Sequence, residues 1–352
     1  MSSGTLAHTN PPRLALVMIV RNEGATIARC LRSARDFVDE MILLDTGSTD
    51  DTVAIASGLG AKVMQWAWRD DFAAARNEAL AHSQADWNLV LDGDEWIAGD
   101  GAILRQAIQE QAVDDCFVGR LPVKSQLEAS DGDGGIAALP VHFTSWLPRF
   151  LPRGVRYEGR IHEQPQSDLP RRDLQVEIGH DGYLPEQKLR KKGRNRELLL
   201  LALVEDPENA YLNYHLGKDF DVYGQFSEAI PCYERALRSV QTGQGWRIDL
   251  IVRILVCLRA LGHDDLAYQL AQDEMQNCQQ SPDFFFLLAH LNISLARKNP
   301  EQALGKYLPM ARLSLQFCLN LGERPDIEGA VFGRGSHAAT ELLALLDQSL
   351  AL

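Results

Sequence analysis

Apolar and polar positions along the first hundred residues form blocks that predict strands and helices in turn. Leu14–Val20 is a run of seven apolar residues, which is typical of a strand buried on both faces. Three further strand candidates lie at residues 41–44, 62–66 and 87–91. Helical spacing of apolar side chains marks residues 23–35, 52–59, 72–82 and 102–111. Alternating strands and helices predict a parallel sheet joined by right-handed crossovers.

The pattern changes between Phe117 and Ile178, where proline, glycine and aromatic residues are frequent and helical spacing is weak. We expect antiparallel strands and loops here that complete the first domain. Residues 130–135, with the sequence SDGDGG, predict a hairpin tip or a mobile loop because glycine and aspartate favour turns.

The rest of the chain predicts helices only. Residues 210–243 match the spacing of a tetratricopeptide repeat through Leu216, Gly217, Phe220, Gly224, Ala229, Tyr233 and Ala236. Small residues in such a repeat let two antiparallel helices approach, and aromatic residues fill the gaps. A fainter copy spans residues 248–281, a degenerate third copy spans 283–315, and the helix at 336–350 is a candidate cap.

These patterns divide the 352 residues into a flexible N-terminus (1–13), an α/β domain (14–187) and an all-α repeat domain (188–352). The repeat domain opens with six basic residues between Lys188 and Arg196. This basic cluster predicts a solvated linker or first helix in preference to a phosphate contact.

Composition narrows the function classes. The net charge is −13, and such a field repels phosphate backbones, so we expect no nucleic-acid partner. The six cysteines include no CxxC pair and predict reduced thiols of a cytoplasmic protein. The longest apolar runs are far shorter than the roughly 20 residues of a spanning helix, so we expect no transmembrane segment.

Polar clusters follow each of the four strand candidates. They are Arg21-Asn22-Glu23, the run from Asp45 to Asp50, Asp70-Asp71, and the run from Asp92 to Glu95. Ligands of a parallel sheet bind beyond the C-terminal ends of its strands. One such cluster is explained by helix capping, but four on one edge predict a single site.

The Asp92-Gly93-Asp94 run has the most specific chemistry. In an extended segment the two carboxylates project to one side and repel each other unless a cation compensates them. A hard divalent ion accepts these oxygens, and a diphosphate supplies the rest of its shell. The alternative is that Asp92 caps a turn and Asp94 starts a helix.

Two other positions also have competing interpretations. Ser48, Thr49 and Asp50 suit the N-cap of the following helix, whereas capping leaves Asp45 free to accept an N–H from a base. Arg76 either belongs to a solvated helical face or turns inward to a base or phosphate.

The ordered motifs MIVRNE, LLDTGSTDDT, DDFAAARN and LVLDGDE resemble family 2 glycosyltransferases of the GT-A fold. The later RFLPRGVRYEGRIHEQP and HDGY, followed by tetratricopeptide repeats, are similar to a bacterial branch of that family. The resemblance covers about Leu14 to Tyr183 and the repeats. It implies a Rossmann-like mixed sheet followed by helical repeats.

The resemblance also implies residue roles. The nucleotide-sugar site would comprise Asn22, Glu23, Asp45, Asp71, Arg76, Asp92, Gly93 and Arg149. The metal site would comprise Asp94, His180 and Asp92, and a glycine loop would lie at Gly154 or Gly159. Glu163 would be the catalytic acidic residue. This chain has His162-Glu163 where many relatives have Glu-Asp, so both remain candidates for the base.

We therefore expect an inverting, hexosyltransferase-type enzyme that uses Mn²⁺ or Mg²⁺ and a nucleotide-diphosphate sugar, with uridine as the expected base. The repeats would recruit a protein or peptide acceptor, or join two copies as a homodimer. The alternatives are a nucleotidyltransferase, which would release pyrophosphate, and an inactive scaffold that works through its repeats.

Overall fold

The structure is a computed structural model that describes residues 11–110, 116–127, 141–181 and 193–350. The chain divides into two compact units. The first comprises residues 1–125 and 146–187, and the second comprises 126–145 and 188–352. The SDGDGG segment, expected to be a hairpin tip, lies outside the described residues.

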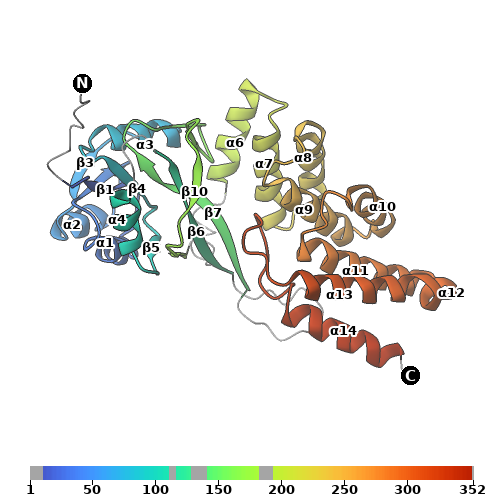
Figure 1. The fold of residues 1–352 in the computed structure, drawn as a ribbon. Coiled ribbons are helices and arrows are strands. Elements are labelled where there is room, and N and C mark those ends of the chain that lie inside the picture. The colour runs from blue at the N-terminus through green and yellow to red at the C-terminus, as the bar shows by residue number, and fades with distance from the viewer. Residues whose placement is uncertain (1–10, 111–115, 128–140, 182–192, 351–352) are drawn as a thin grey trace, which may run out of the picture. The chain divides into compact units, whose positions relative to one another are not determined.

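A mixed sheet forms the centre of the first unit (Figure 1). Its path is β3-β2-β1-β4-β7-β6-β11-β5, and β10 pairs with β6, which makes nine strands within the described ranges. The strands are β1 (Leu14–Val20), β2 (Glu40–Asp45), β3 (Lys62–Gln65), β4 (Trp87–Val90), β5 (Glu95–Ile97), β6 (Val118–Leu127), β7 (Val141–Pro152), β10 (Arg171–Asp173) and β11 (Ile178–His180). Strands β8 (Arg156–Glu158) and β9 (Gln164–Gln166) form a separate antiparallel pair.

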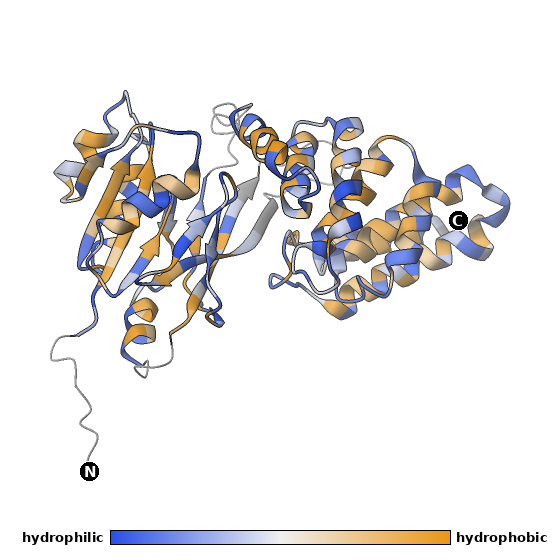
Figure 2. Ribbon diagram, turned by 90° about the horizontal axis from the view of Figure 1, so that it is seen from above, coloured by the Kyte–Doolittle hydropathy of each residue, from blue (hydrophilic) through white to orange (hydrophobic). Residues whose placement is uncertain are grey.

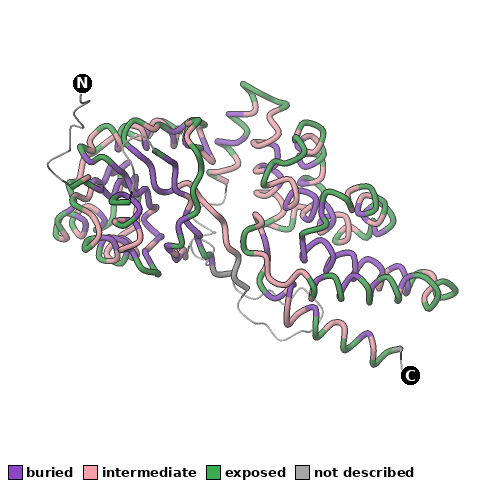
Figure 3. Tube along the Cα trace, viewed as in Figure 1, coloured by how far each residue is buried: buried purple, intermediate pink, exposed green. Residues whose placement is uncertain are grey.

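Strand β1 occupies the middle of the parallel part, paired in parallel with β2 and β4. All seven of its residues are buried, which is why the sequence shows no alternation there. The central strands are apolar in Figure 2 and buried in Figure 3. The parallel prediction for the first hundred residues is confirmed for β1 to β4.

The later strands differ from the antiparallel expectation. Strand β7 does pair antiparallel with β4, but β10 and β11 both pair parallel with β6. The β4–β7 step is packed by aromatic side chains, because Trp87 stacks on Phe150 at 4.7 Å between ring centroids and contacts Phe117 at 4.9 Å. These contacts join the two halves of the sheet through one apolar core.

The helices of the first unit are α1 (Ile27–Ala34), α2 (Thr52–Gly58), α3 (Phe72–Ala81) and α4 (Ala102–Gln109). Helix α1 buries Ile27, Cys30, Leu31 and Ala34, the i, i+3, i+4, i+7 face of an amphipathic helix. The helix therefore begins four residues later than Glu23, where the sequence pattern placed it.

The second unit contains stacked helix pairs. Its helices are α6 (Arg194–Glu205), α7 (Ala210–Val222), α8 (Phe226–Ser239), α9 (Arg247–Ala260), α10 (Asp264–Glu274), α11 (Pro282–Lys298), α12 (Pro300–Gln302), α13 (Leu308–Leu321) and α14 (His337–Leu350), with the π-helical turn η1 (Ala303–Tyr307) before α13. The pairs α7–α8, α9–α10 and α11–α13 correspond to the three predicted repeats.

The first repeat shows why its sequence contains small residues. A side chain at Gly217 would overlap the Tyr233 ring, and Ala229 and Ala236 are fully buried. Of the basic cluster, residues 188–192 lie outside the described residues, while Arg196 pairs with Asp219 at 2.7 Å and covers the Phe220 ring. Arg196 therefore belongs to the repeat packing, as the helical interpretation of the cluster predicted. Across the described residues, no helix is long and apolar enough to span a bilayer.

Candidate functional site

The ends of β1 and β2 are joined by side-chain hydrogen bonds. Asn22 N donates to Ser48 Oγ at 2.9 Å, and Asn22 Oδ1 accepts from Thr49 N at 2.7 Å. Glu23 N donates to Thr52 Oγ1 at 2.8 Å. Ser48 and Thr49 therefore bind residue 22 and do not cap α2 as expected. In that turn only Asp50 has a cap-like bond, accepting from Thr52 N at 3.0 Å.

The end of β4 lies against the end of β1. A Cβ at Gly93 would lie 2.6 Å from Glu23 Cγ, so only glycine lets these two segments touch. The start of α3 is hydrogen-bonded to the loop between β8 and β9, which carries Glu163. Phe72 N donates to Arg160 O of this loop at 2.8 Å. The structure thus brings together the polar clusters that follow β1, β2 and β4, while the Asp70-Asp71 loop lies against residue 160.

Two predicted binding residues have local hydrogen bonds. Asp45 is buried and accepts from Ser48 N at 3.1 Å and from Gly47 N at 3.3 Å. Asp71 is the N-cap of α3 and accepts from Ala74 N at 2.8 Å. The Asp45 carboxylate closes its own turn and does not cap α2, and its role toward a base stays a prediction.

Arg76 lies at the centre of a buried ion-pair cluster. It is 5% exposed, so the solvated-face alternative is wrong. Its Nη2 donates to Asp92 Oδ1 at 2.7 Å, and its Nε donates to Glu163 Oε1. Arg149 Nη2 donates to Asp92 Oδ2 at 2.8 Å and to Glu95 Oε1 at 2.5 Å. Three carboxylates and two guanidinium groups therefore alternate in one network, the ion-pair cluster.

Strand register explains how distant residues meet in this cluster. Antiparallel pairing of β4 with β7 places Leu89 opposite Phe150. Continuing that register sets Arg149 opposite Val90, the last residue of β4 and two residues before Asp92. The guanidinium group therefore reaches both Asp92 and Glu95, although these are more than 50 residues away in the sequence.

Opposite charges shift the pKa values of the cluster. Burial alone would raise the pKa of Asp92, but Arg149 and Arg76 hold it well below its usual value. Burial would lower the pKa of Arg76, and the carboxylates of Asp92 and Glu163 instead raise it well above its usual value. Burial raises the pKa of Glu95 despite the opposing charge of Arg149.

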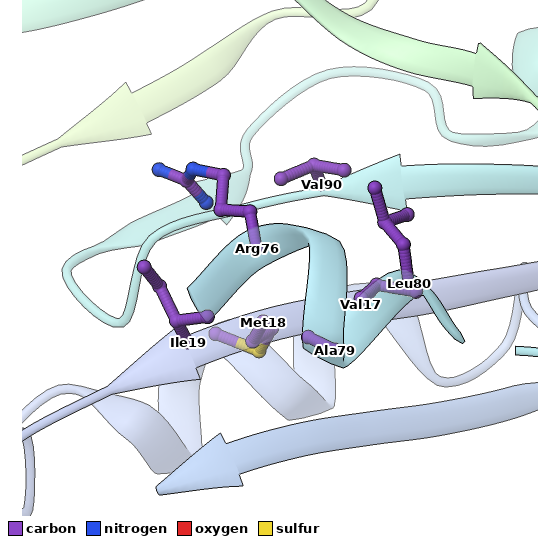
Figure 4. Close-up of a pocket in the computed structure, with 7 residues that line it drawn as sticks. All are labelled: Val17, Met18, Ile19, Arg76, Ala79, Leu80 and Val90. Atoms are coloured by element: carbon purple, nitrogen blue, oxygen red, sulfur yellow. The ribbon is translucent and has the colours of Figure 1, made fainter. Parts of the chain in front are cut away.

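The cluster has unused hydrogen-bond donors. Arg76 Nη1 and Arg149 Nε are buried and have no hydrogen-bond partner, which is uncommon for buried polar atoms. Arg76 also borders a narrow crevice beneath α3, lined by Val17, Met18, Ile19, Ala79, Leu80 and Val90. Figure 4 shows its guanidinium group extending toward the C-terminal end of β4. The Asp92 side chain is 35% exposed, so the cluster opens to solvent on that side.

Asp94 and His180 form a second pair beside the cluster. Pairing of β11 with β5 and β6 places His180 opposite Glu95 and Ser125. His180 Nδ1 forms a hydrogen bond with Ser125 Oγ at 2.8 Å, and His180 Nε2 lies 3.6 Å from Asp94 Oδ2. A hydrogen bond to one ring nitrogen that orients the other toward a carboxylate is typical of metal-binding histidines.

The residues fit a divalent ion only in part. Within the described ranges, no group of three or more histidine, cysteine, aspartate or glutamate residues could hold a metal. Both Asp92 oxygens are bonded to arginines, which does not suit the metal role expected of it. Asp94 and His180 offer one oxygen and one nitrogen, a donor set that Mn²⁺ or Mg²⁺ accepts when a bound ligand adds oxygens.

The loop that carries His162 and Glu163 has an unusual backbone. His162 adopts φ 52°, a left-handed conformation that is uncommon outside glycine. Gly159, just before it, has φ 94°, and Gly154 has the same angle in the turn after β7. Glu163, one of the two candidate bases, is part of the ion-pair cluster through its bond with Arg76 Nε.

Three contributors to the site were not assigned from the sequence. Glu95 accepts from Asp92 N at 2.9 Å and orders the turn, and Ser125 orients His180. The Tyr157 ring lies 5.5 Å from the Arg76 guanidinium carbon. Glu95 could have been assigned from the sequence because it belongs to the same acidic run as Asp94. No comparable pattern indicated Ser125 or Tyr157.

The site lies at the carboxyl ends of parallel strands in a mixed sheet, the edge at which α/β proteins bind their ligands. A family model described as glycosyl transferase family 2 matches residues 15–151. A TPR repeat-containing protein of Synechococcus elongatus is 31% identical over 296 residues, covering 79% of this chain and 70% of the relative. The chain belongs to glycosyl transferase family 2, in a branch with tetratricopeptide repeats, and its first unit is a glycosyltransferase domain.

Other known proteins are similar over smaller shares. The SPbeta prophage-derived glycosyltransferase SunS of Bacillus subtilis is 27% identical, over 71% of this chain and 59% of its own length. Glucosyl-3-phosphoglycerate synthase of Mycobacterium tuberculosis, solved with Mg²⁺ and uridine diphosphate, is 26% identical. That match covers 32% of this chain and 43% of the synthase, with a TM-score of 0.27.

Proposed function

We propose that the first unit transfers a sugar, with inversion, from a nucleotide-diphosphate sugar to an acceptor hydroxyl or thiol. The observation that carries the proposal is the ion-pair cluster with two unused guanidinium donors beside the Asp94–His180 pair. Both donors are buried beside the exposed edge of Asp92, and their positive charge there suits an anionic ligand such as a nucleoside diphosphate. Uridine is the base we expect.

Each residue then has a chemical task. Arg76 and Arg149 hold Asp92 in place, and Asp92 presents its exposed edge to the ribose. Asn22, Glu23 and Asp45 shape the nucleotide side of the site through the turns that they close. Asp94 and His180 would hold Mn²⁺ or Mg²⁺, which neutralises charge on a departing diphosphate. We leave Asp92 out of the metal site because both its oxygens are taken.

Glu163 is the base that we assign. Arg76 Nε fixes one carboxylate oxygen of Glu163, and the other takes the proton from the acceptor. The acceptor atom bonds to the anomeric carbon on one face as the bond to the diphosphate oxygen breaks on the other. The nucleoside diphosphate leaves with that electron pair. The hexosyltransferase type of donor is part of the proposal.

The acceptor that we propose is a polypeptide recruited by the repeats, since stacked repeats form extended binding surfaces. All six cysteines are free thiols. This fits a reducing compartment such as the cytoplasm, where nucleotide sugars would be used.

The test is a thermal-unfolding series with uridine, guanosine, adenosine and cytidine diphosphates, each with and without Mn²⁺ or Mg²⁺. Selective binding to the native state raises the midpoint by mass action, equivalent to about 2.7 kcal/mol at a ligand concentration of 100 Kd. We expect one nucleotide to act, only with metal, and Asp94→Asn to abolish the shift. Glu78→Gln, on the surface of α3, is the matched control and should leave it unchanged.

Two other results would redirect the assignment. Pyrophosphate release from a nucleoside triphosphate would identify a nucleotidyltransferase. A folded protein whose midpoint responds to no nucleotide would overturn the transferase proposal and leave the scaffold alternative.

A further inference from the structure

A segment of the second unit lies against α9 and α11, the first helices of the second and third repeats, and comes near Lys218 of α7. Helices α7, α9 and α11 stack in that order, and we call their shared surface the α7–α9–α11 face. The chain leaves α13, crosses this face and returns to α14 (Figure 1). We call the crossing segment, residues 322–336, the strap.

The two ends of the strap are hydrogen-bonded to each other. Gly333 N donates to Glu323 Oε1 at 3.0 Å, and Ser336 Oγ donates to the same oxygen at 2.5 Å. A Cβ at Gly335 would overlap the carbonyl of Gly322. Loops of this length whose ends meet and whose own groups pack them are often functional.

The middle of the strap meets α9 through a glycine. Gly329 has φ 74°, and a Cβ there would overlap Asp249 Oδ1. The neighbouring Glu328 is hydrogen-bonded to Ser145 and lies near Lys218 on α7 and near Asp249 and Arg253 on α9. Only glycine lets the strap backbone approach Asp249 of α9 this closely.

The end of the strap satisfies a buried carboxylate of α11. Asp283 is 3% exposed. It accepts from Val331 N at 3.2 Å and pairs with Arg334 Nη1 at 2.8 Å. Both donors belong to the strap, so this part of α11 depends on an arginine and a backbone N–H brought from outside the helix.

Directional polar contacts hold the strap more than apolar burial does. Phe332, its largest apolar side chain, is 58% exposed, and Pro325 and Asp326 are also exposed. Ala330 is its one buried apolar residue. A bound peptide is held in the same way, by a few anchors and its backbone.

We propose that the α7–α9–α11 face is a docking surface for an extended polypeptide segment, and that the strap occupies it in cis. The partner segment would carry a glycine against Asp249 and, five residues later, an arginine for Asp283, as Gly329 and Arg334 do. This proposal specifies how the polypeptide acceptor of the proposed function would bind, and its biological role depends on that function. The surface itself is tested without sugar transfer, so the two can fail separately.

The test uses a synthetic, fluorescently labelled peptide with the sequence of residues 322–336. The protein is the full chain with residues 323–335 replaced by a Gly/Ser linker of equal length. We expect saturable binding to this linker variant and at least about tenfold weaker binding to the wild type, because a tethered segment competes at an effective concentration near millimolar. Peptide binding should also raise the thermal midpoint of the linker variant.

Matched changes locate the anchors. Arg334→Ala in the peptide, or Asp283→Asn in the linker variant, should each weaken binding at least about tenfold, since truncating a buried charge pair is costly. Arg324→Ala in the peptide removes the same charge from a residue that pairs mainly with Asp326, and should weaken binding less than about threefold. Absence of binding to the folded linker variant, or equal binding of the Arg334→Ala peptide, would overturn the proposal.

A second measurement decides the matter if the linker variant does not fold. Arg334→Ala in the full chain should accelerate hydrogen exchange at Val331 and Gly333 while α11 amides keep their protection. If the α11 amides lose protection as well, the strap is part of the repeat core and the docking surface is refuted.

Discussion

The two units each bury a network of charged and phenolic groups, and the networks differ in how fully their hydrogen bonds are satisfied. In the second unit, Arg253 Nε donates to Asp249 Oδ2 at 2.7 Å, and Arg253 Nη1 donates to Asp221 Oδ2 at 2.9 Å. The Tyr214 and Tyr233 hydroxyls donate to Asp249 and Asp221. Within the described ranges, none of these five residues has a buried polar atom without a partner.

The ion-pair cluster of the first unit is incomplete by comparison. Arg76 Nη1 and Arg149 Nε lack partners, and Asp92 is one-third exposed. A buried donor without a partner costs stability, whereas the fully bonded network of the second unit joins its helices without that cost. The comparison therefore distinguishes a fully hydrogen-bonded (closed) network from an incomplete (open) cluster, although the residue types are similar in both.

The largest expected effect is on catalysis in the open cluster. Glu163→Gln should lower the rate of donor turnover by about 10²–10⁴-fold, the usual contribution of a general base. Nucleotide-induced thermal shifts should remain, because the amide oxygen still accepts from Arg76 Nε. The measurement is release of nucleoside diphosphate from the matching nucleotide sugar.

His162→Gln is the paired variant for that experiment. We expect it to keep turnover within about tenfold of the wild type. If His162→Gln is the inactive member of the pair while Glu163→Gln retains activity, the base is His162.

Next in size is the stability of the closed network. Asp249→Ala should destabilise the second unit by about 3–5 kcal/mol, because Arg253 loses a buried partner. Asp92→Ala should cost the first unit less than half as much, since Asp92 already faces solvent, while it abolishes the nucleotide shift. Denaturant unfolding followed by circular dichroism measures both.

The control for these variants is the exposed pair of Arg312 with Asp347. Asp347→Ala should change the free energy of unfolding by about 0–1 kcal/mol, as surface ion pairs do. Equal losses for Asp249→Ala and Asp92→Ala would erase the distinction between the two networks.

A substitution of intermediate effect probes the geometry of the open cluster. Arg76→Lys keeps the charge but cannot bond Asp92 and Glu163 at once. We expect turnover to fall about 10–100-fold and the nucleotide affinity to weaken by a smaller factor. Unchanged turnover would mean that Arg76 contributes charge alone.

The smallest expected effect concerns pH. Burial raises the pKa of Tyr157 from 10.0 to about 12, so its contribution to stability is complete below pH 10 and is lost as pH rises through 12. At pH 11 the loss is about 1.4 kcal/mol. Tyr157→Phe should remove this loss of unfolding free energy between pH 9 and pH 11, the two conditions to be compared.

An unchanged loss in Tyr157→Phe would show that Tyr157 ionises as freely in the native chain as in the unfolded one. The open cluster would then be better solvated than its burial indicates. Difference absorbance of tyrosinate in the two proteins provides an independent check.

The sequence alone determined much of the architecture. Strands β1 to β4, the helices between them and the first repeat pair follow from local periodicity and from small residues such as Gly217. The meeting of the polar clusters at one edge also follows, because parallel strands end on the same side. Arg76 and Asp92 could therefore be proposed as site residues from their positions, whereas Glu163 was proposed from the family resemblance.

Only the tertiary structure decided which charges pair. Arg149 meets Asp92 and Glu95 because β7 pairs with β4 in one particular register, and His180 meets Ser125 because β11 pairs with β6. The strap reaches Asp283 across about 50 residues of intervening helix. Local periodicity reports only on neighbours along the chain, whereas these contacts depend on how distant segments pack, and the ionised groups they bury take their pKa values from that packing.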